Sequence, residues 1–423
     1  MSFVYIMPFI ILAVCFLLNA PVGLSMIAAC VTFFVTSGQD VSLVSDIIMN
    51  SLYTNTVMIA IPLFIFTANI MNSGKVTEYM FTFAKGCVGR KRGAMAYVNV
   101  LVSLIFSGMT GSALADASGI GLMEIDEMQR DGYDTPFSCA ITAATATIGP
   151  IFPPSIPMVV YAMLSGTSVG SLFMGGVVPA LMITVALCLY VGYISKKRDY
   201  PRGHQFTLRE FLSYTLRALP ALFTPVILIG GIYTGITTPT EAAVVSVVYS
   251  LIVSIFVYKT MTLKSLIPVT NATIRGVAPT MLVVAGATTF GRVLTMMQVP
   301  QSIAMTLTTV FTSKVALLLA INVFLLFVGM IMETMAAILI CTPIFLPVVT
   351  AIGMDPIQFG VIMIVNLAIG FITPPVGINL YVSSNMTGVP VLTVARRALP
   401  YIACLLIALL MFTFIPELSL VLL

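Results

Sequence analysis

Charged residues are scarce in this sequence. Only 8% of its 423 residues are Asp, Glu, Lys or Arg, whereas 59% are hydrophobic. A water-soluble domain carries roughly 25% charged residues. A chain with so few charges cannot cover its own surface in water, so the bilayer must be its solvent. This composition excludes soluble enzymes and nucleic-acid-binding proteins.

Clusters of metal-binding or disulfide-forming residues are also missing. The seven cysteines are scattered without a CxxC pair, and the single histidine, His204, stands in a charged segment. Neither a zinc site nor a disulfide framework is indicated, and a lone histidine in a loop is typical of solvated surface. No GxxxxGK[ST] motif occurs, so the chain itself does not hydrolyse ATP. We expect no catalytic site.

Long apolar runs, by contrast, are abundant. A helix needs about 20 apolar residues to cross roughly 30 Å of hydrocarbon. The sequence therefore predicts an all-α polytopic membrane protein with about ten spans. These spans lie at residues 3–19, 21–37, 55–72, 137–164, 171–194, 218–236, 240–258, 277–295, 357–383 and 398–420.

Two further apolar runs, 93–128 and 315–346, do not fit this scheme. The first follows Arg90–Arg92 and precedes Arg130, so its two ends lie on the same side if basic residues stay cytoplasmic. Each of its arms has only about 12–14 residues, which is too short for two full crossings. We interpret both runs as re-entrant helical hairpins.

The basic residues then gather on one face of the membrane. Seventeen of the 19 Lys and Arg residues fall there, leaving only Arg292 and Lys314. Because basic residues concentrate in cytoplasmic loops, this face is cytoplasmic. The unpaired acids Asp40, Asp46 and Asp355 fall on the opposite face, which places both termini outside the cytoplasm.

The chain also contains an internal repeat at a shift of 221 residues. Between equivalent points lie five predicted spans, an odd number, so the halves have opposite orientations. The charges agree, because 74–92 holds five basic residues and 296–313 holds none. Inverted repeats of this kind are the architecture of secondary transporters. The superposed pairs are Gly108/Gly329, Met109/Met330, Gly132/Gly353, Asp134/Asp355, Gly149/Gly370, Pro153/Pro374, Pro154/Pro375 and Pro179/Pro400.

The repeat suggests a division into scaffold and transport segments. The polar but amphipathic stretch 74–90 is predicted to be an interfacial arm helix. The expected divisions are 1–92 for scaffold spans and arm, 93–195 for the first transport half, 196–217 for a cytoplasmic linker, 218–314 for scaffold spans and a second arm, and 315–423 for the second transport half.

Each half is interrupted twice within its apolar segments. The hairpin tips are expected at 107–116 and 329–334, and the broken spans at 148–155 and 369–379. Pro-Pro inside a span removes two backbone donors and frees carbonyl oxygens at membrane depth. With the nearby Ser and Thr hydroxyls, these oxygens suit Na⁺, while half-helix amino termini suit an anionic substrate. The alternative is that Gly and Pro here only permit close packing and kinks.

Ionisable residues within the membrane are few. Asp116, Glu241 and Glu333 are the intramembrane acids, and no intramembrane His is present for a proton relay. Sodium coupling is therefore favoured over proton coupling, although Asp116 or Glu333 could bind a proton. Arg292 could contact a substrate carboxylate or snorkel to the interface.

Five longer motifs together identify a family. The chain resembles the large membrane (M) subunit of tripartite ATP-independent periplasmic (TRAP) transporters over essentially its whole length. The motifs are SGMTGSALADASGIG (107–121), TIGPIFPPS (147–155), TGITTPTEAA (234–243), GMIMETMA (329–336) and NLAIGFITPPVGINLYV (366–382).

The resemblance implies a function and partners. It implies a bacterial inner-membrane, Na⁺-driven importer of an organic anion, either sialic acid or a C4-dicarboxylate, in which a transport domain moves like an elevator against a scaffold. It also implies a small four-helix membrane subunit of the Q type and a soluble periplasmic substrate-binding protein as partners, neither encoded here.

The resemblance also carries site residues onto this chain. The sodium set is Ser107, Gly108, Thr110, Gly111, Ser112, Gly149, Pro153, Pro154, Gly329, Gly370, Thr373, Pro374 and Pro375. The candidate substrate contacts are Ser155, Asp116, Glu333, Asn379 and Arg292. The halves are unequal copies, because Gly111-Ser112 in the first tip corresponds to Met332-Glu333 in the second.

Two other classes of function remain open on the sequence alone. A gated channel could also be lined by hairpins and half-helices, and a passive structural subunit would need only the spans. The internal pseudo-symmetry favours the transporter, since it supplies both halves of a pathway in one chain.

Overall fold

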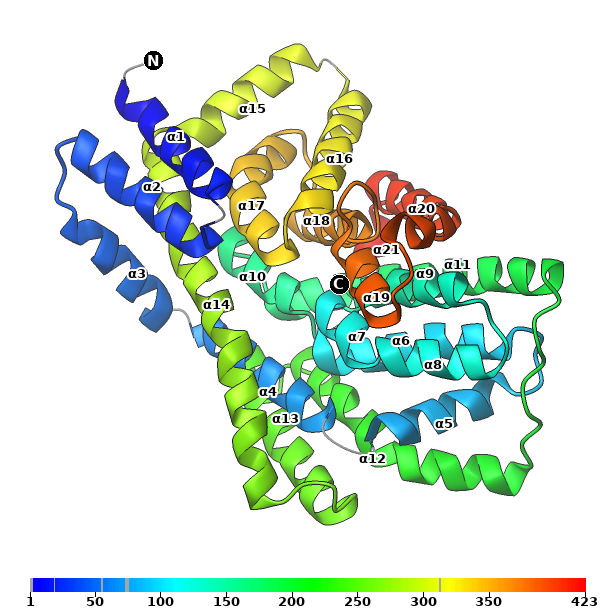
Figure 1. Cartoon of the computed structure of the whole chain (residues 1–423). Coiled ribbons are helices and arrows are strands. Elements are labelled where there is room, and N and C mark those ends of the chain that lie inside the picture. Colours follow the sequence, from blue (N-terminus) through cyan, green and yellow to red (C-terminus); the bar gives the residue numbers. More distant parts are fainter. Residues whose placement is uncertain (1–2, 19, 55, 73–75, 312) are drawn as a thin grey trace.

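The fold is built from helices throughout its described length. The computed structural model describes residues 3–18, 20–54, 56–72, 76–311 and 313–423. Within these ranges the only β pairing is a single bridge between Arg92 and Arg202. Figure 1 shows α1–α3 on one flank, the long α14 crossing the molecule, and the remaining helices packed beside it.

The helices fall into four consecutive groups. The first is α1 (Phe3–Leu17), α2 (Val22–Thr36), α3 (Ser42–Thr54), α4 (Ala60–Asn72) and α5 (Val76–Val88). The second is α6 (Ala94–Thr110), α7 (Ala113–Gly119), α8 (Gly121–Arg130), α9 (Thr135–Thr145), α10 (Ile156–Ser165) and α11 (Val169–Lys197). The third is α12 (Leu208–Tyr233), α13 (Pro239–Ile252), α14 (Leu263–Met296) and α15 (Val299–Val310). The fourth is α16 (Lys314–Ile331), α17 (Thr334–Ala351), α18 (Pro356–Gly370), α19 (Ile378–Thr387), α20 (Val391–Phe414) and α21 (Glu417–Leu420).

The described helices include seven that are long and apolar enough to cross a membrane, or eight if the bent pair at 42–72 is one span. Five of the seven coincide with expected spans, and the other two are α16 (Lys314–Ile331) and α17 (Thr334–Ala351), the arms of the second expected hairpin, which are each long enough to cross. Four other expected spans are not single long helices, for two physical reasons. Residues 137–164 and 357–383 are broken at Pro-Pro, so neither contains one long helix. The apolar helices α1 and α2 have only 15 residues each.

The expected repeat is confirmed at several helix boundaries. Residue 113 begins α7 and residue 334 begins α17, while residue 135 begins α9 and residue 356 begins α18, each pair 221 residues apart. The helices α5 and α15, which were predicted to be arms, also occupy corresponding positions. Pro153-Pro154 and Pro374-Pro375, at equivalent positions, are the described cis peptide bonds.

The hairpin tips are shorter than the sequence suggests. We expected the first tip at 107–116, but α6 continues to Thr110, so the turn consists of Gly111 and Ser112 alone. Gly111 adopts φ +60°, the left-handed conformation that ends a helix abruptly, and the Ser112 side chain caps α7. The second tip is Met332-Glu333, with Glu333 capping α17. The hairpin arms are therefore longer than expected. Helix α6 has 17 residues, and α16 and α17 have 18 each.

The centre of the core is formed by the first segments of the two broken spans. Every residue from Gln358 to Gly370 in α18 is buried, as is every residue from Phe137 to Thr145 in α9. Tyr161 of α10 packs edge-on to Phe359 with ring centroids 6.5 Å apart, and its hydroxyl donates to Pro356 O. These contacts join the two halves.

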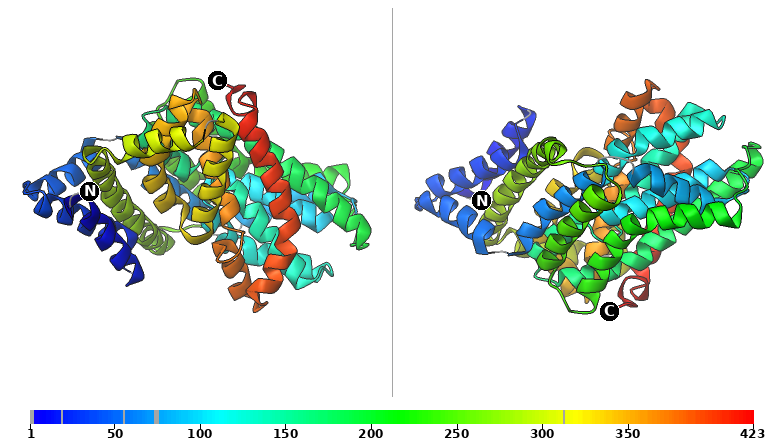
Figure 2. Two further views of the ribbon diagram at one scale, coloured as in Figure 1. Left: turned by 90° about the horizontal axis from the view of Figure 1, so that it is seen from above. Right: turned by 90° about the horizontal axis from the view of Figure 1, so that it is seen from below.

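The helices predicted to form the scaffold lie outside this core. The long α14 packs against α2, α3 and α4, and Figure 2 shows it alongside the α1–α2 pair. We expected a span at 277–295, but the helix begins at Leu263 because Thr262 caps it. The helix α3 and the start of α12 at Leu208 were not expected, and the latter shortens the 196–217 linker. A reciprocal capping box between Thr207 and Glu210 starts α12 there.

Candidate functional site

The first hairpin tip is pressed against the broken span that follows it. Ile156 N donates to Gly111 O at 3.3 Å. A β-carbon on Gly111 would lie 2.4 Å from Pro154 O, and one on Gly149 would lie 3.0 Å from Ser112 O. Two backbones can approach this closely only because neither glycine has a side chain. The contact concentrates carbonyl oxygens inside the fold.

Hydroxyl groups surround this first cluster. Buried Ser107 donates to Leu104 O at 2.6 Å, and Thr110 donates to Phe106 O at 3.4 Å. Ser112 Oγ accepts from Ala115 N at 3.4 Å. Ser155 Oγ accepts from Met158 N at 3.2 Å and donates to Pro150 O. Each hydroxyl oxygen therefore keeps acceptor capacity in a neutral setting, which fits an alkali cation.

Gly108, a member of the expected sodium set, does not face the first oxygen cluster. A β-carbon on Gly108 would lie 3.0 Å from Pro225 Cβ and 3.4 Å from the Phe152 ring. Gly108 thus allows α6 to pack closely on α12. Pro153 and Pro154 form the cis turn whose carbonyl reaches Gly111.

The second half repeats the interlock with different residues. A β-carbon on Gly329 would lie 2.9 Å from Leu367 O, and Gly377 N donates to Met330 O at 3.3 Å. Thr373 Oγ1 donates to Ile369 O at 2.7 Å. The turn then passes through Pro374 and Pro375 in the cis form. Backbone oxygens and the Thr373 hydroxyl make this a second neutral cluster.

Both tips open onto one cavity of about 530 Å³. Thr110 and Ser112 of the first tip and Glu333 and Thr334 of the second line it, with Pro150 and Ile156 between them. The opposite wall comes from α2, α4 and α14. Figure 1 shows α17 beside the long α14. A concave site of this volume, mostly apolar with a few polar groups, suits a small molecule.

Comparison with known proteins places the chain in a family. Residues 9–418 match the family described as the tripartite ATP-independent periplasmic transporter, DctM component. The chain belongs to this family. It is a TRAP large permease, and its apolar helices mark a multi-pass protein of the bacterial inner membrane.

Individual relatives carry different solute names. The sialic acid TRAP transporter large permease SiaM of Vibrio cholerae is 40% identical over 403 residues, covering 95% of this chain and 94% of that protein. The C4-dicarboxylate large permease DctM of Pseudomonas aeruginosa is 42% identical over 365 residues, 86% of each chain. The YdaH transporter of Alcanivorax borkumensis is similar in fold, with a TM-score of 0.62 at 15% identity, covering 88% of this chain and 86% of that one.

Family membership supports two general expectations for this permease, namely solute import and the presence of partner proteins. Its relatives are solute importers, and the family implies a small membrane subunit and a periplasmic binding protein as partners. The relatives are named as transporter permeases.

Glu333 is the one ionisable residue on the cavity wall within the described residues. Its Oε2 accepts from Met335 N at 2.8 Å and from Ala336 N at 3.3 Å, which caps α17. The side chain is nonetheless exposed, and the surface that it lines is the cavity.

The other expected substrate contacts of the permease do not line this cavity. Ser155 and Asn379 are fully buried, and Asn379 Nδ2 donates to Ala143 O at 3.5 Å, bridging the halves. Arg292 is exposed on α14, away from the cavity lining. Asp116 is 1% exposed inside the first hairpin.

Asp116 has unusual surroundings inside that hairpin. Neither of its carboxylate oxygens has a hydrogen-bond partner among the described residues. The neighbouring buried acid, Glu124, accepts from Ser103 at 3.3 Å, and Ser103 Oγ also lies 3.0 Å from Thr145 Oγ1. An ionised carboxylate without partners is costly to bury.

Sequence reasoning missed part of the cavity wall. Asn69 on α4, Ser118 on α7 and Thr280 on α14 line it, and Asn69 Nδ2 donates to Thr273 Oγ1 at 3.0 Å. An Asn within an apolar span is a signal that could have identified Asn69. Ser118 and Thr280 carry no such signal, because Ser and Thr are frequent in helices that pack closely.

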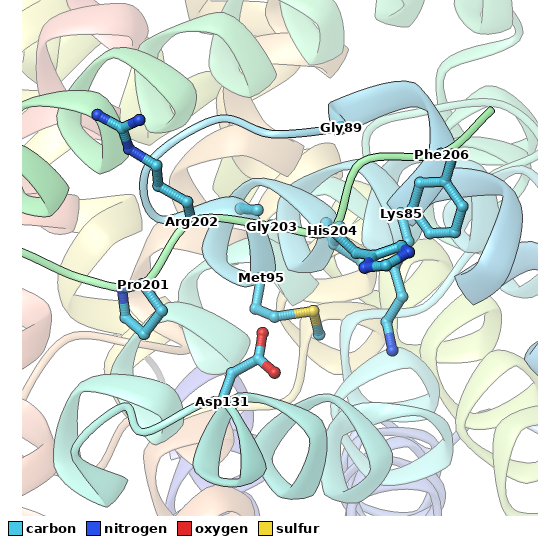
Figure 3. Close-up of a pocket in the computed structure, with 11 residues that line it drawn as sticks. Lys85, Gly89, Met95, Asp131, Pro201, Arg202, Gly203, His204 and Phe206 are labelled. Atoms are coloured by element: carbon cyan, nitrogen blue, oxygen red, sulfur yellow. The ribbon is translucent and has the colours of Figure 1, made fainter. Parts of the chain in front are cut away.

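A second cavity, of about 380 Å³, lies under the 196–217 linker (Figure 3). Its walls include Lys85, Asp131 and His204. The linker is tied down at this point, since Gly93 N donates to Pro201 O at 2.8 Å and Gly203 N to Lys91 O at 3.2 Å. None of the expected sodium or substrate residues lines this cavity.

The same linker is anchored by a polar cluster around Asp134. Arg198 pairs with Asp134 at 3.0 Å, and the Tyr200 hydroxyl donates to Asp134 at 2.5 Å. Burial, together with this hydrogen bond, raises the pKa of Tyr200 to about 12. The phenol therefore remains a protonated donor at physiological pH.

Proposed function

We propose that this permease imports a small organic anion together with Na⁺, by an elevator movement of its hairpin-bearing halves. The observation that carries the proposal is one cavity bounded on one side by both hairpin tips and on the other by scaffold helices. Ser112 and Glu333 belong to the first wall, and Asn69 belongs to the second.

This division of the walls supplies the mechanism. The tips and broken spans are interlocked by glycine contacts, so they move as one body carrying Ser112 and Glu333. The scaffold wall stays in place. A cavity shared by two bodies opens to the other side of the membrane when one body slides past the other.

Sodium enters this scheme as a co-substrate held behind the tips. The first cluster offers the hydroxyls of Ser107, Thr110 and Ser112 with nearby backbone carbonyls, and the second offers Thr373 and the backbone around Gly329. Hard cations prefer such oxygen ligands. An ion bound there would tie each tip to its broken span and so complete the substrate cavity.

The membrane potential then drives uptake. Each positive charge that crosses is worth about 2.3 kcal/mol per 100 mV. Two or three Na⁺ with a monovalent anion carry net positive charge inward, so accumulation is favourable.

The solute class follows from the relatives. Their names cite sialic acid, C4-dicarboxylates and isethionate, all organic anions. We propose that a soluble periplasmic binding protein delivers such an anion and that a small four-helix membrane subunit completes the scaffold.

The test is uptake into proteoliposomes that hold this chain with its small membrane subunit. Labelled sialic acid and succinate are supplied with and without an inward Na⁺ gradient, and with and without the matching binding protein. Uptake that needs both sodium and binding protein is expected. Uptake that needs neither would support a channel instead.

A further inference from the structure

One ion pair crosses a cleft between the predicted arm α5 and the first hairpin. Lys85 Nζ of α5 lies 2.6 Å from Glu127 Oε2 of α8, and the two side chains are 34% and 22% exposed. The cleft, of about 700 Å³, has α5 on one side and α7 and α8 on the other. Open space separates the two surfaces along it, so side-chain packing does not hold them together there. Among the described residues, this is the one ion pair that joins α5 to the hairpin.

The two partners belong to different predicted bodies. Figure 1 shows α5 between α8 and the scaffold helix α12. The arm is fixed to α12 by apolar contacts, because the Phe83 and Phe211 rings stack with centroids 6.3 Å apart and a β-carbon on Gly86 would lie 2.7 Å from the Phe211 ring. Helix α8 continues the first hairpin. If the hairpin half slides against the scaffold, Lys85 and Glu127 must separate.

Glu127 has a second partner that moves with it. Arg130 Nη1 lies 2.9 Å from Glu127 Oε1, and both residues are on α8. When Lys85 leaves, Arg130 stays, so the carboxylate keeps an ion-pair partner. Lys85 therefore opposes separation of the hairpin from the arm, whereas Arg130 lowers its cost.

The internal repeat shows that this pair is not needed for the arm and hairpin to fold. At the shift of 221 residues, Thr306, Val348 and Ala351 stand in place of the lysine, the glutamate and the arginine. None of these side chains can form an ion pair. The second arm and hairpin occupy corresponding positions without one, so the pair is an addition to the first half alone.

We infer that the Lys85–Glu127 ion pair is a latch, which holds the first hairpin against its arm in the conformation described here and opens when the hairpin half moves. The inference rests on the proposed function, because it requires the elevator movement. An ion pair suits a latch, since both groups regain water when it breaks and the pair re-forms at little cost.

The test measures a distance between the two bodies by double electron–electron resonance. The complex of this chain with its small membrane subunit is placed in nanodiscs, with the seven native cysteines replaced by Ala. Spin labels are attached at Arg209→Cys on the scaffold helix α12 and at Asn385→Cys on α19 of the second transport half. Both positions are exposed, and neither belongs to the latch.

Four variants are compared with the parent: Lys85→Met, Glu127→Gln, the two combined, and Arg130→Met. Elution volume and melting temperature show whether each variant folds. Arg130→Met is the matched control, because it removes the same charge from the same carboxylate but on the hairpin side. A general effect of lost positive charge would change the populations of Lys85→Met and Arg130→Met in the same direction.

Two distance populations are expected in the parent. The ratio of the population that matches this structure to the other should fall about three- to fivefold in Lys85→Met. Glu127→Gln should also lower the ratio, and the combined variant should lower it no further than the larger single effect, because one pair is broken in all three. Arg130→Met should raise the ratio by about twofold.

An unchanged ratio in folded Lys85→Met would overturn the latch, as would a fall of the same size in Arg130→Met. A single population in the parent at every Na⁺ concentration would overturn the latch and the elevator movement together. Sodium-driven uptake by the parent then separates the two failures. If uptake persists, only the movement and its latch are wrong; if no acid is taken up, the proposed function fails as well.

Discussion

Gly329 and Gly370 face each other so closely that a β-carbon on Gly370 would lie 2.3 Å from the carbonyl carbon of Gly329. The contact joins the second hairpin to the broken span behind it. The two residues are 41 positions apart in the sequence, and each has a glycine counterpart, Gly108 and Gly149, in the first half.

Replacement of Gly370 by Ala should therefore destabilise the permease. The added methyl group meets backbone, which cannot move aside as a flexible side chain can, so we expect a loss of about 2–4 kcal/mol. Melting temperature in detergent is the measurement. Gly230→Ala is the control, because a β-carbon there meets nothing within 4 Å. Equal melting temperatures for the two variants would show that the glycine contact is dispensable.

Thr110→Ala and Ser112→Ala should each weaken sodium activation of transport. Both remove a hydroxyl beside the first oxygen cluster, so the sodium concentration for half-maximal uptake should rise about three- to tenfold while folding is retained. The exposed Thr234→Ala serves as control. Normal sodium dependence in both tip variants would remove these hydroxyls from the sodium site.

Asp116→Asn should leave the permease at least as stable as the wild type. The carboxylate oxygens have no hydrogen-bond partner among the described residues, so a neutral side chain of the same shape avoids the cost of burying a charge. Thermal unfolding with and without NaCl measures this. A melting temperature lowered by 5 °C or more, roughly 1 kcal/mol or above for a large protein, would instead mean that the carboxylate is compensated by a bound ion.

Asp134→Ala should loosen the linker without affecting the cavity. It removes the partner of both Arg198 and Tyr200 and leaves the Tyr200 hydroxyl without its acceptor, at a cost of about 1–3 kcal/mol. Faster proteolysis within 198–207 is expected, and Tyr200→Phe should show a smaller effect. Unchanged proteolysis in Asp134→Ala would contradict an anchoring role.

Much of the fold was predictable because Gly and Pro residues recur at equivalent positions of the two halves and so reveal the internal repeat. Gly149/Gly370 and Pro153/Pro374 reveal the 221-residue shift, and the structure repeats its helices at that shift. Tip lengths were not predictable. Whether 107–116 forms one long loop or a two-residue turn depends on the left-handed conformation of Gly111, which the sequence permits without requiring it.

The candidate site was predictable only in part. Thr110, Ser112 and Glu333 lie at tips that the repeat identifies, and the structure brings them to one cavity. Asp116 and Asn379 are polar residues in the same motifs, yet they point into the protein interior. Side-chain direction within a short helix depends on tertiary packing, which motif spacing does not specify. The scaffold wall at Asn69 depends on the approach of α4 and α14, distant in sequence.

The central claim is sodium-coupled transport through the shared cavity. It is tested most directly by measuring whether sialic acid accumulates inside proteoliposomes. Proteoliposomes with this chain, its small membrane subunit and the binding protein are loaded with unlabelled sialic acid at the external concentration, and labelled sialic acid is followed under an inward Na⁺ gradient. The internal concentration should rise above the external one and collapse when the gradient is removed. Equilibration without accumulation, at the same level with or without the gradient, would contradict sodium-coupled import and indicate a passive pathway.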